Sequence, residues 1–531
     1  MTNRPPRLPA VVVIASMFAF FVIALLIAAA LCWLAWVLYE RAFTGGWTQG
    51  GLHLAALATP LVVAAGTIVW SLLPRRDRFV PPGPELSERD APGLFREIQR
   101  IAAATGQAPP GHVYASLGVE AFVTERGGVM GFGSTRVLAV GLALLELLSE
   151  TEAAAVLAHE FGHFHAGDTK LGPWVLGTRA SIGRTIENLG RVGDLEMDLW
   201  IVRRMLALVR GLRAPFEWFW RLHLRITRGI ARAQEYAADA VAARVVGPQA
   251  LAEALKKTRV GSLAFDAYLH TSVLPVLEAG FRPRITEGFR AFLRAQRQGP
   301  ALDLALHEAL HDHSGTPDDS HPPIPDRLAA LAKLSGPQPP FDSRPAIAWL
   351  EDVASLEARI IVSRPDGTAL QDVAWTDVMM RALAPVWRDR LAQDQRVLSG
   401  LTPALVVLQP ANMRRRVRAL VGGIIDGAPD DEVAARFAEV VGAAVVLALV
   451  DRGWTAIAVT GEGIRVERDG VVVEPFEEVA LALQGEAEAA AWRARVEALG
   501  IAEVALDRVV DGPRRARARH AQTTRARRGA R

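Results

Sequence analysis

The segment SETEAAAVLAHEFGHFHAGD, residues 149–168, carries the most informative pattern in this chain. Ser149 can cap a helix with its hydroxyl, and Glu152, three residues later, can reach back to the amide of Ser149. Gly167 can take the left-handed conformation that commonly ends a helix. The segment is therefore predicted to form a single helix with both ends marked.

This helix contains the pattern H-E-x-x-H at His159, Glu160 and His163. Four residues turn a helix by about 400°, so the two histidines lie one turn apart on one face and can direct two ring nitrogens to one tetrahedral metal ion. Glu160 projects beside that ion, where it can take a proton from an activated water and pass it to a leaving amine. The pattern predicts one hydrolytic Zn²⁺ site per chain; two exposed helical histidines are the alternative.

Two histidines and a water leave one protein ligand to be found. Residues 232–243 read RAQEYAADAVAA, a helical segment in which Glu235 and Asp239 lie four apart on one face. Glu235 is the predicted third ligand, and Asp239 is predicted to accept the distal ring proton of a ligand histidine. A solvated acidic face is the ordinary interpretation of such a pair, and the upstream helix favours ligation. The single Cys32 excludes an internal disulfide framework and a cysteine-based zinc site.

Two long uncharged stretches, residues 9–39 and 52–73, precede this helix. Each exceeds the roughly 20 residues that a helix needs to cross a bilayer, which predicts a pair of transmembrane helices within residues 1–80. A buried hairpin of helices is the alternative. Positive charges flank the two spans at Arg4, Arg7, Arg75, Arg76 and Arg78. The positive-inside rule then predicts that both termini and the metal site are cytoplasmic.

A small sheet is predicted between the membrane pair and the metal helix. Residues 91–105 have helical periodicity, and short strand-like runs follow at 113–115, 121–124 and 136–140. A sheet edge near a metallopeptidase site can hold an extended substrate, although such strands can equally be ordinary core. The expected fold class is mainly α with a small sheet, that is, α+β.

Three motifs, LAHEFGHFHAGD at 157–168, QEYAADA at 234–240 and SHPPIPDRLAAL at 320–331, carry a resemblance to a known family. Together they resemble the membrane zinc metallopeptidases that include the CAAX prenyl protease and the bacterial heat-shock protease HtpX. The resemblance covers about residues 10–335 and implies a gluzincin-like domain.

The resemblance implies a role for each matching residue. His159, His163 and Glu235 would bind zinc, Glu160 would be the general base, and Asp239 would support a ligand. His321 and Arg327 match positions that face the substrate, and a loop histidine and an arginine are residue types that stabilise an oxyanion. The implied activity is a zinc metalloendopeptidase that hydrolyses membrane or membrane-proximal proteins in the bacterial inner membrane; an inactive membrane-tethered scaffold is the alternative.

The chain departs from that family in two places. Glu120 stands where relatives often carry Asn before Ala-Phe, which leaves the contacts with the substrate backbone there open. Within residues 172–230, where some relatives have additional membrane helices, arginines interrupt the aromatic segment 199–226. Two amphipathic helices broken at Pro215 are predicted, lying either at the membrane interface or against the catalytic domain.

The last third of the chain forms two further parts after the predicted catalytic domain, which spans residues 81–339. Residues 340–511 are predicted to be an α+β module, with helices at 346–356 and 431–450. A hairpin of 454–459 with 463–476 is predicted to turn at Asp469-Gly470. No catalytic pattern occurs in this module, so an interaction or a purely structural role stays open.

Residues 512–531 contain eight arginines and no acidic residue, although the net charge of the whole chain is only +3. We expect a disordered tail that contacts anionic lipid headgroups. Nucleic acid is a weaker expectation, because no aromatic residues alternate with the arginines to stack on bases.

Overall fold

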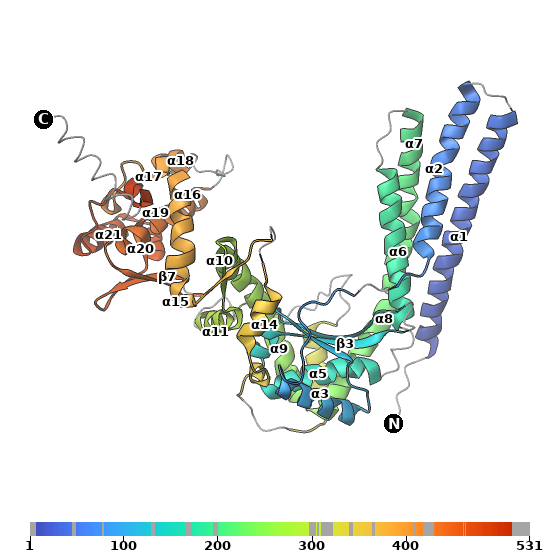
Figure 1. Ribbon diagram of the computed structural model, residues 1–531, viewed down its shortest axis with the longest axis horizontal. Helices are drawn as coiled ribbons and strands as arrows, with labels where there is room; N and C mark the ends of the chain where they lie inside the picture. Colours follow the sequence, from blue (N-terminus) through green and yellow to red (C-terminus); the bar gives the residue numbers. More distant parts are fainter. Residues whose placement is uncertain are drawn as a thin grey trace. The chain divides into compact units, whose positions relative to one another are not determined.

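The computed structural model describes residues 7–44, 49–76, 79–128, 133–165, 172–194, 200–296, 304, 307–308, 322–338, 343–363, 367–393, 395–406, 410–417, 429–459, 461 and 463–511. The chain is mostly helical with small sheets, as predicted (Figure 1). It forms two compact units, Met1–Val260 with Leu306–Asp352, and Gly261–Ala305 with Val353–Arg531.

The predicted N-terminal pair of helices is confirmed. Helix α1 spans Arg7–Thr44 and helix α2 spans Gln49–Leu72, and both contain stretches long and apolar enough to cross a membrane. Their contact face uses small residues such as Ala24, Ala28 and Ala58, which allow close packing of the helices. Large apolar side chains such as Trp33 and Trp36 point outward, as a lipid-facing surface requires.

Three further helices pack against this pair. They are α6 (Gly172–Gly193), α7 (Trp200–Gly211) and α8 (Arg213–Val245). α6 and α7 run alongside α2 (Figure 1), and Phe216 and Phe219 of α8 share a buried cluster with Phe20 of α1. Ser16 and His223 form a buried hydrogen bond of 3.1 Å between α1 and α8.

These contacts refine what was expected for the segment 199–226. α7 and α8 separate at Leu212 rather than at Pro215, which lies in the first turn of α8. A proline is tolerated in the first turn because no intrahelical partner exists for its missing N–H. The described residues of the segment therefore pack with α1 and α2 in one helical bundle, and their predicted place at the membrane interface stays a prediction.

The small sheet of the first unit contains the predicted strands. β1 (His112–Ser116) is parallel to the central strand β3 (Thr135–Gly141), and β2 (Ala121–Arg126) is antiparallel to it. β2 is an edge strand in this order, and it contacts the metal helix α5 (Glu150–His165). Helix α3 (Pro92–Thr105) ends at Gly106, whose φ of 66° is left-handed.

Shorter elements complete the first unit. α4 spans Leu142–Leu147, α13 spans Ile324–Leu331, and a 3₁₀ helix spans Ala346–Trp349. The 3₁₀ helix is followed by a separate helix in the second unit, so the single helix predicted at 346–356 is wrong. Helix α9 (Pro248–Tyr268) begins in the first unit and ends in the second.

The second unit is built from two separate parts of the chain. The described residues 261–296 pack with the C-terminal part of the chain, whereas the predicted domain boundary near residue 340 stays a prediction. Strand β4 (Phe281–Pro283) pairs in parallel with β5 (Gln371–Val373). The buried Glu357 carboxylate accepts hydrogen bonds from the amides of Ile285 and Thr286, at the start of helix α11 (Ile285–Gln296).

The core of the second unit surrounds helix α19 (Asp430–Val450). α19 is apolar enough to be a candidate membrane span, but its side chains are packed into the cluster of this unit, as a core helix requires. The strands β6 (Thr455–Val459), β7 (Gly463–Arg468) and β8 (Val471–Val473) form an antiparallel meander. The predicted turn at Asp469 and Gly470 is confirmed between β7 and β8, since both residues have positive φ.

The remaining helices of this unit are α10 (Leu274–Glu278), α11 (Ile285–Gln296), α14 (Val353–Ile360), α15 (Trp375–Val378), α16 (Ala384–Gln393), α17 (Gln395–Leu398), α18 (Pro410–Val417), α20 (Pro475–Ala482) and α21 (Glu486–Ala498). Short 3₁₀ and π turns span Leu269–Val273, Met379–Leu383, Pro403–Leu405 and Leu506–Asp511.

Candidate metal centre

The helix that carries the histidines begins with the predicted cap. The amide of Ser149 donates to the Glu152 carboxylate at 2.9 Å, and the amide of Glu152 donates to the Ser149 hydroxyl at 3.3 Å. Lys257 of α9 also binds the Glu152 carboxylate, at 2.6 Å. These contacts fix the start of α5 in the first unit, whereas Gly167, the predicted end of the helix, lies outside the described residues.

A glycine allows the two helices that carry the candidate ligands to pack closely. A Cβ atom on Gly162 of α5 would lie 2.7 Å from the Cα and 2.9 Å from the carbonyl oxygen of Ala238 on α8. Only a residue without a side chain allows this approach. The close contact places the histidines of α5 opposite the carboxylates of α8.

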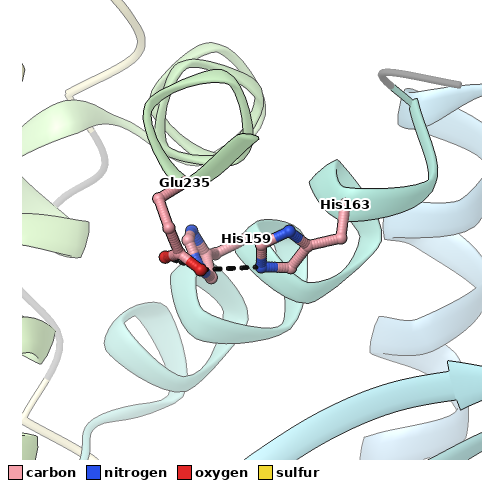
Figure 2. A group of neighbouring side chains, drawn as sticks. All are labelled: His159, His163 and Glu235. Atoms are coloured by element: carbon pink, nitrogen blue, oxygen red, sulfur yellow. Dashed lines mark ion pairs between the residues drawn. The ribbon is translucent and has the colours of Figure 1, made fainter. Parts of the chain in front are cut away.

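Three predicted ligands converge at this contact, as Figure 2 shows. His159 Nε2 lies 3.5 Å from Glu235 Oε2, and His163 Nε2 lies 3.7 Å from Glu235 Oε1. One donor atom from each residue lies within 4.8 Å of the others. Around an ion with bonds of about 2.05 Å, tetrahedral ligand atoms are about 3.3 Å apart. The donor set and its spacing fit a catalytic zinc ion.

Asp239, one turn after Glu235, orients the first histidine. Its Oδ1 lies 2.9 Å from His159 Nδ1, so the ring donates from Nδ1 and leaves the Nε2 lone pair on the side of Glu235. Asp239 is only 1% exposed, and His159 is 6% exposed. Asp239 therefore lies behind the candidate ligand His159, shielded from solvent.

Arg327 of α13 completes this buried group. Its Nε donates to Asp239 Oδ2 at 2.9 Å and its Nη2 donates to Asp239 Oδ1 at 2.5 Å, a bidentate pair. Its Nη1 lies 3.7 Å from Glu235 Oε2. With 6% of its surface exposed, Arg327 contacts the residues that hold the ligands. This position differs from the substrate-facing one that the resemblance implies.

The charges of the group favour a cation at the ligand position. Burial lowers the pKa of His159, but hydrogen bonds to Asp239 and Glu235 outweigh it and raise this pKa to about 9. Burial raises the pKa of Asp239, and hydrogen bonds from His159 and Arg327 outweigh it and lower that pKa. The carboxylates of Glu160, Glu235 and Asp239 face the one guanidinium of Arg327, and they leave two excess negative charges once His159 is neutral, as a metal ligand must be. A divalent cation would balance them.

The predicted base Glu160 lies beside the free edge of the sheet. The amide of Val123 in β2 donates to Glu160 Oε2 at 3.2 Å. Nearby, Glu120 accepts a hydrogen bond from the Ser116 hydroxyl at 3.0 Å. Glu160 as a whole is partly exposed, which leaves room for water or a peptide group beside it.

The structure brings together every predicted site residue that it describes; the exception is His321, which lies outside the described residues. Sequence reasoning missed Gly162 and Val123. The glycine inside the H-E-F-G-H run was a usable signal, because a glycine in a helix interior costs about 1 kcal/mol unless packing requires it. Val123 left no signal, because its contact uses a backbone amide.

The sequence of this region matches a known family. Residues 88–335 match the profile of Peptidase family M48. This chain carries a peptidase family M48 domain. The chain is 26% identical over 300 residues to a protein named Protease HtpX homolog from Nostoc punctiforme, covering 54% of this chain and 89% of that protein.

Two other relatives of the M48 domain agree. Protease HtpX of Mannheimia succiniciproducens is 25% identical over 303 residues, covering 54% of this chain and 90% of the relative. Protease HtpX of Haemophilus ducreyi is 30% identical over 183 residues, covering 31% of this chain and 57% of the relative. No solved structure matches the chain. The predicted resemblance is confirmed for residues 88–335, and the chain also has helices that are long and apolar enough to cross a membrane.

Proposed function

We propose that this protein is a zinc-dependent endopeptidase that hydrolyses peptide bonds of membrane or membrane-proximal proteins. The observation that carries the proposal is the convergence of His159, His163 and Glu235 beside Glu160. Two imidazoles and one carboxylate form a donor set of catalytic zinc sites, which keep a fourth position open. The metallopeptidase character of the M48 family supports the same assignment.

Each residue of the site has a separate role in the proposed reaction. When bound, a zinc ion polarises the substrate carbonyl and lowers the pKa of water towards neutrality. Glu160 accepts a proton from the attacking water and donates it to the nitrogen of the leaving amine. Asp239 holds His159 in the tautomer that ligates through Nε2, and Arg327 is a positioning residue that holds Asp239. His321 is proposed to donate to the oxyanion.

An extended substrate is proposed to bind along strand β2. β2 is an edge strand, and the amide of Val123 points to Glu160 rather than to β3. A peptide that adds to this edge would hydrogen-bond to the backbone of β2, which gives affinity without a strict sequence requirement. Its scissile bond would then pass within reach of Glu160.

The site is proposed to face the cytoplasm of a bacterial cell, with both termini on the same side of the cell membrane. Arg75 and Arg76 directly follow α2, as the positive-inside rule requires for a cytoplasmic end. The named relatives are bacterial proteins. The arginines of residues 512–531 are proposed to contact anionic lipid on that side.

Metal analysis of the purified full-length protein, followed by digestion of unfolded casein, tests the proposal. We expect about one zinc ion per chain and proteolysis that a chelator abolishes and added zinc restores. Glu160→Gln is the matched control, because it keeps the ligands and removes the base. If wild type holds no zinc, or if the Glu160→Gln variant cleaves casein as fast as wild type, the proposal is contradicted and the inactive scaffold is favoured.

A further inference from the structure

A groove of about 520 Å³ lies between helices α2 and α6 of the membrane bundle. On α2, four of its lining residues follow the spacing i, i+3, i+4 and i+7, which places them on one face of the helix. They are Val63, Gly66, Thr67 and Trp70. The Trp70 side chain is 61% exposed. The groove therefore opens onto the outer surface of the helical bundle, which is the surface that would face lipid if α2 crosses a membrane.

Polar contacts fix the end of α2 to α6 and so hold the two walls in place. The guanidinium of Arg184 donates to the carbonyl oxygen of Ser71 at 3.0 and 3.3 Å. The side-chain amide of Asn188 donates to the Ser71 hydroxyl at 3.0 Å. Asn188 also lines the groove, so a polar donor is held at its wall.

The groove has positive charge as well as apolar surface. Arg75 and Arg191 both line it. The Arg75 guanidinium lies 5.4 Å from the ring centre of Trp70, and Arg191 pairs with Glu187 on α6. Among the described residues of this region, the Glu187 carboxylate pairs with Arg191, while Arg75 and the nearby Arg184 add further positive charge.

The position of these residues along α2 gives the groove an apolar end and a charged end. Arg75 follows the uncharged span directly, so it lies at headgroup depth, where tryptophans such as Trp70 also concentrate. Val63 lies nine residues before Leu72, the last residue of α2, which is about 13.5 Å along the helix. An occupant must therefore combine an anionic head with an apolar tail.

We propose that the groove between α2 and α6 binds one anionic phospholipid. Its phosphate would contact Arg75, Arg191 and Asn188, and an acyl chain would lie along Val63 and Gly66. Basic pockets between membrane helices are the usual sites for anionic headgroups. The proposal does not depend on the protease activity, because none of these residues contacts the metal centre.

The test is native mass spectrometry of the full-length protein, released from nanodiscs of phosphatidylcholine that also contain phosphatidylglycerol, an anionic lipid. We expect wild type to retain one phosphatidylglycerol. Arg75→Gln with Arg191→Gln should weaken this binding by about 25- to 30-fold, since each arginine near the surface contributes about fivefold. Arg41→Gln, which removes one exposed charge at the other end of the helix pair, should retain the lipid.

Gly66→Leu tests the acyl part separately. A Cβ at Gly66 meets no protein atom within 4 Å, so the leucine should fill the groove without disturbing the bundle. We expect it to displace the lipid while both arginines remain. Retention of phosphatidylglycerol by both the double arginine variant and Gly66→Leu would overturn the proposal. Equal retention of phosphatidylcholine, displacement by inorganic phosphate alone, or a lipid-free dimer joined through this face would also overturn it.

Discussion

Replacing Asp239 with asparagine tests the buried arrangement that orients the metal ligands. Asp239 accepts hydrogen bonds from His159 and, twice, from Arg327. Asparagine has nearly the same shape but only one acceptor oxygen, and its amide group must then face an N–H donor. Because Asp239 is 1% exposed, water cannot satisfy the displaced donor.

The size of the effect follows from these contacts. An unsatisfied buried donor costs about 1–3 kcal/mol, and removing one partner of a buried ion pair costs about 3–5 kcal/mol. Arg327 keeps a weaker partner in Glu235 at 3.7 Å, so we expect a loss of stability of about 3 kcal/mol. Loss of the group that orients a ligand typically lowers metal affinity by about 10- to 100-fold, and we expect that range for zinc.

Zinc affinity should be measured by competition with a chromogenic chelator, after circular dichroism has shown that each variant is folded. Asp326→Asn is the matched control, because this carboxylate is exposed one residue before Arg327 and should leave zinc affinity unchanged. Glu235→Ala should have the larger effect, since it leaves only two histidine ligands. If Asp239→Asn binds zinc as tightly as wild type, the orienting role is refuted; if it loses zinc while Glu235→Ala retains it, the two roles are exchanged.

Four further predictions can be checked independently. Glu160→Gln should retain zinc and lose about 10³- to 10⁴-fold in casein cleavage, measured by initial rates. A reporter that fluoresces only in the cytoplasm should be active when fused after Arg76, and a reporter that works only outside the cell membrane should be active when fused after Thr44. The reverse pattern would place the metal centre outside the cell membrane. Burial raises the pKa of the Glu357 carboxyl despite its hydrogen bonds, so this pKa is higher in the folded than in the unfolded protein. Wild type should therefore lose stability relative to Glu357→Gln as the pH rises from about 4 to 7. Melting temperatures of the two proteins that change in parallel with pH would contradict this. Ser149→Ala should cost about 1 kcal/mol in denaturant unfolding, because the cap of α5 is lost.

Local sequence determined the elements that depend on spacing along the chain. The helix cap at Ser149, the face shared by His159 and His163, and the apolar length of α1 and α2 each follow from residues a few positions apart. Helical geometry and the thickness of a bilayer fix these features without reference to any distant segment.

Tertiary structure alone decided which distant segments meet. Glu235 lies 72 positions after His163, and nothing in local spacing shows that a contact between Gly162 and Ala238 brings them together. Arg327 could be expected at the site by resemblance, but its burial against Asp239 depends on where α13 packs. Likewise, nothing in local spacing shows that β4 at residues 281–283 pairs with β5 at residues 371–373 within the second unit. Such contacts come from packing and from satisfying buried polar groups across the chain, and a linear pattern does not record them.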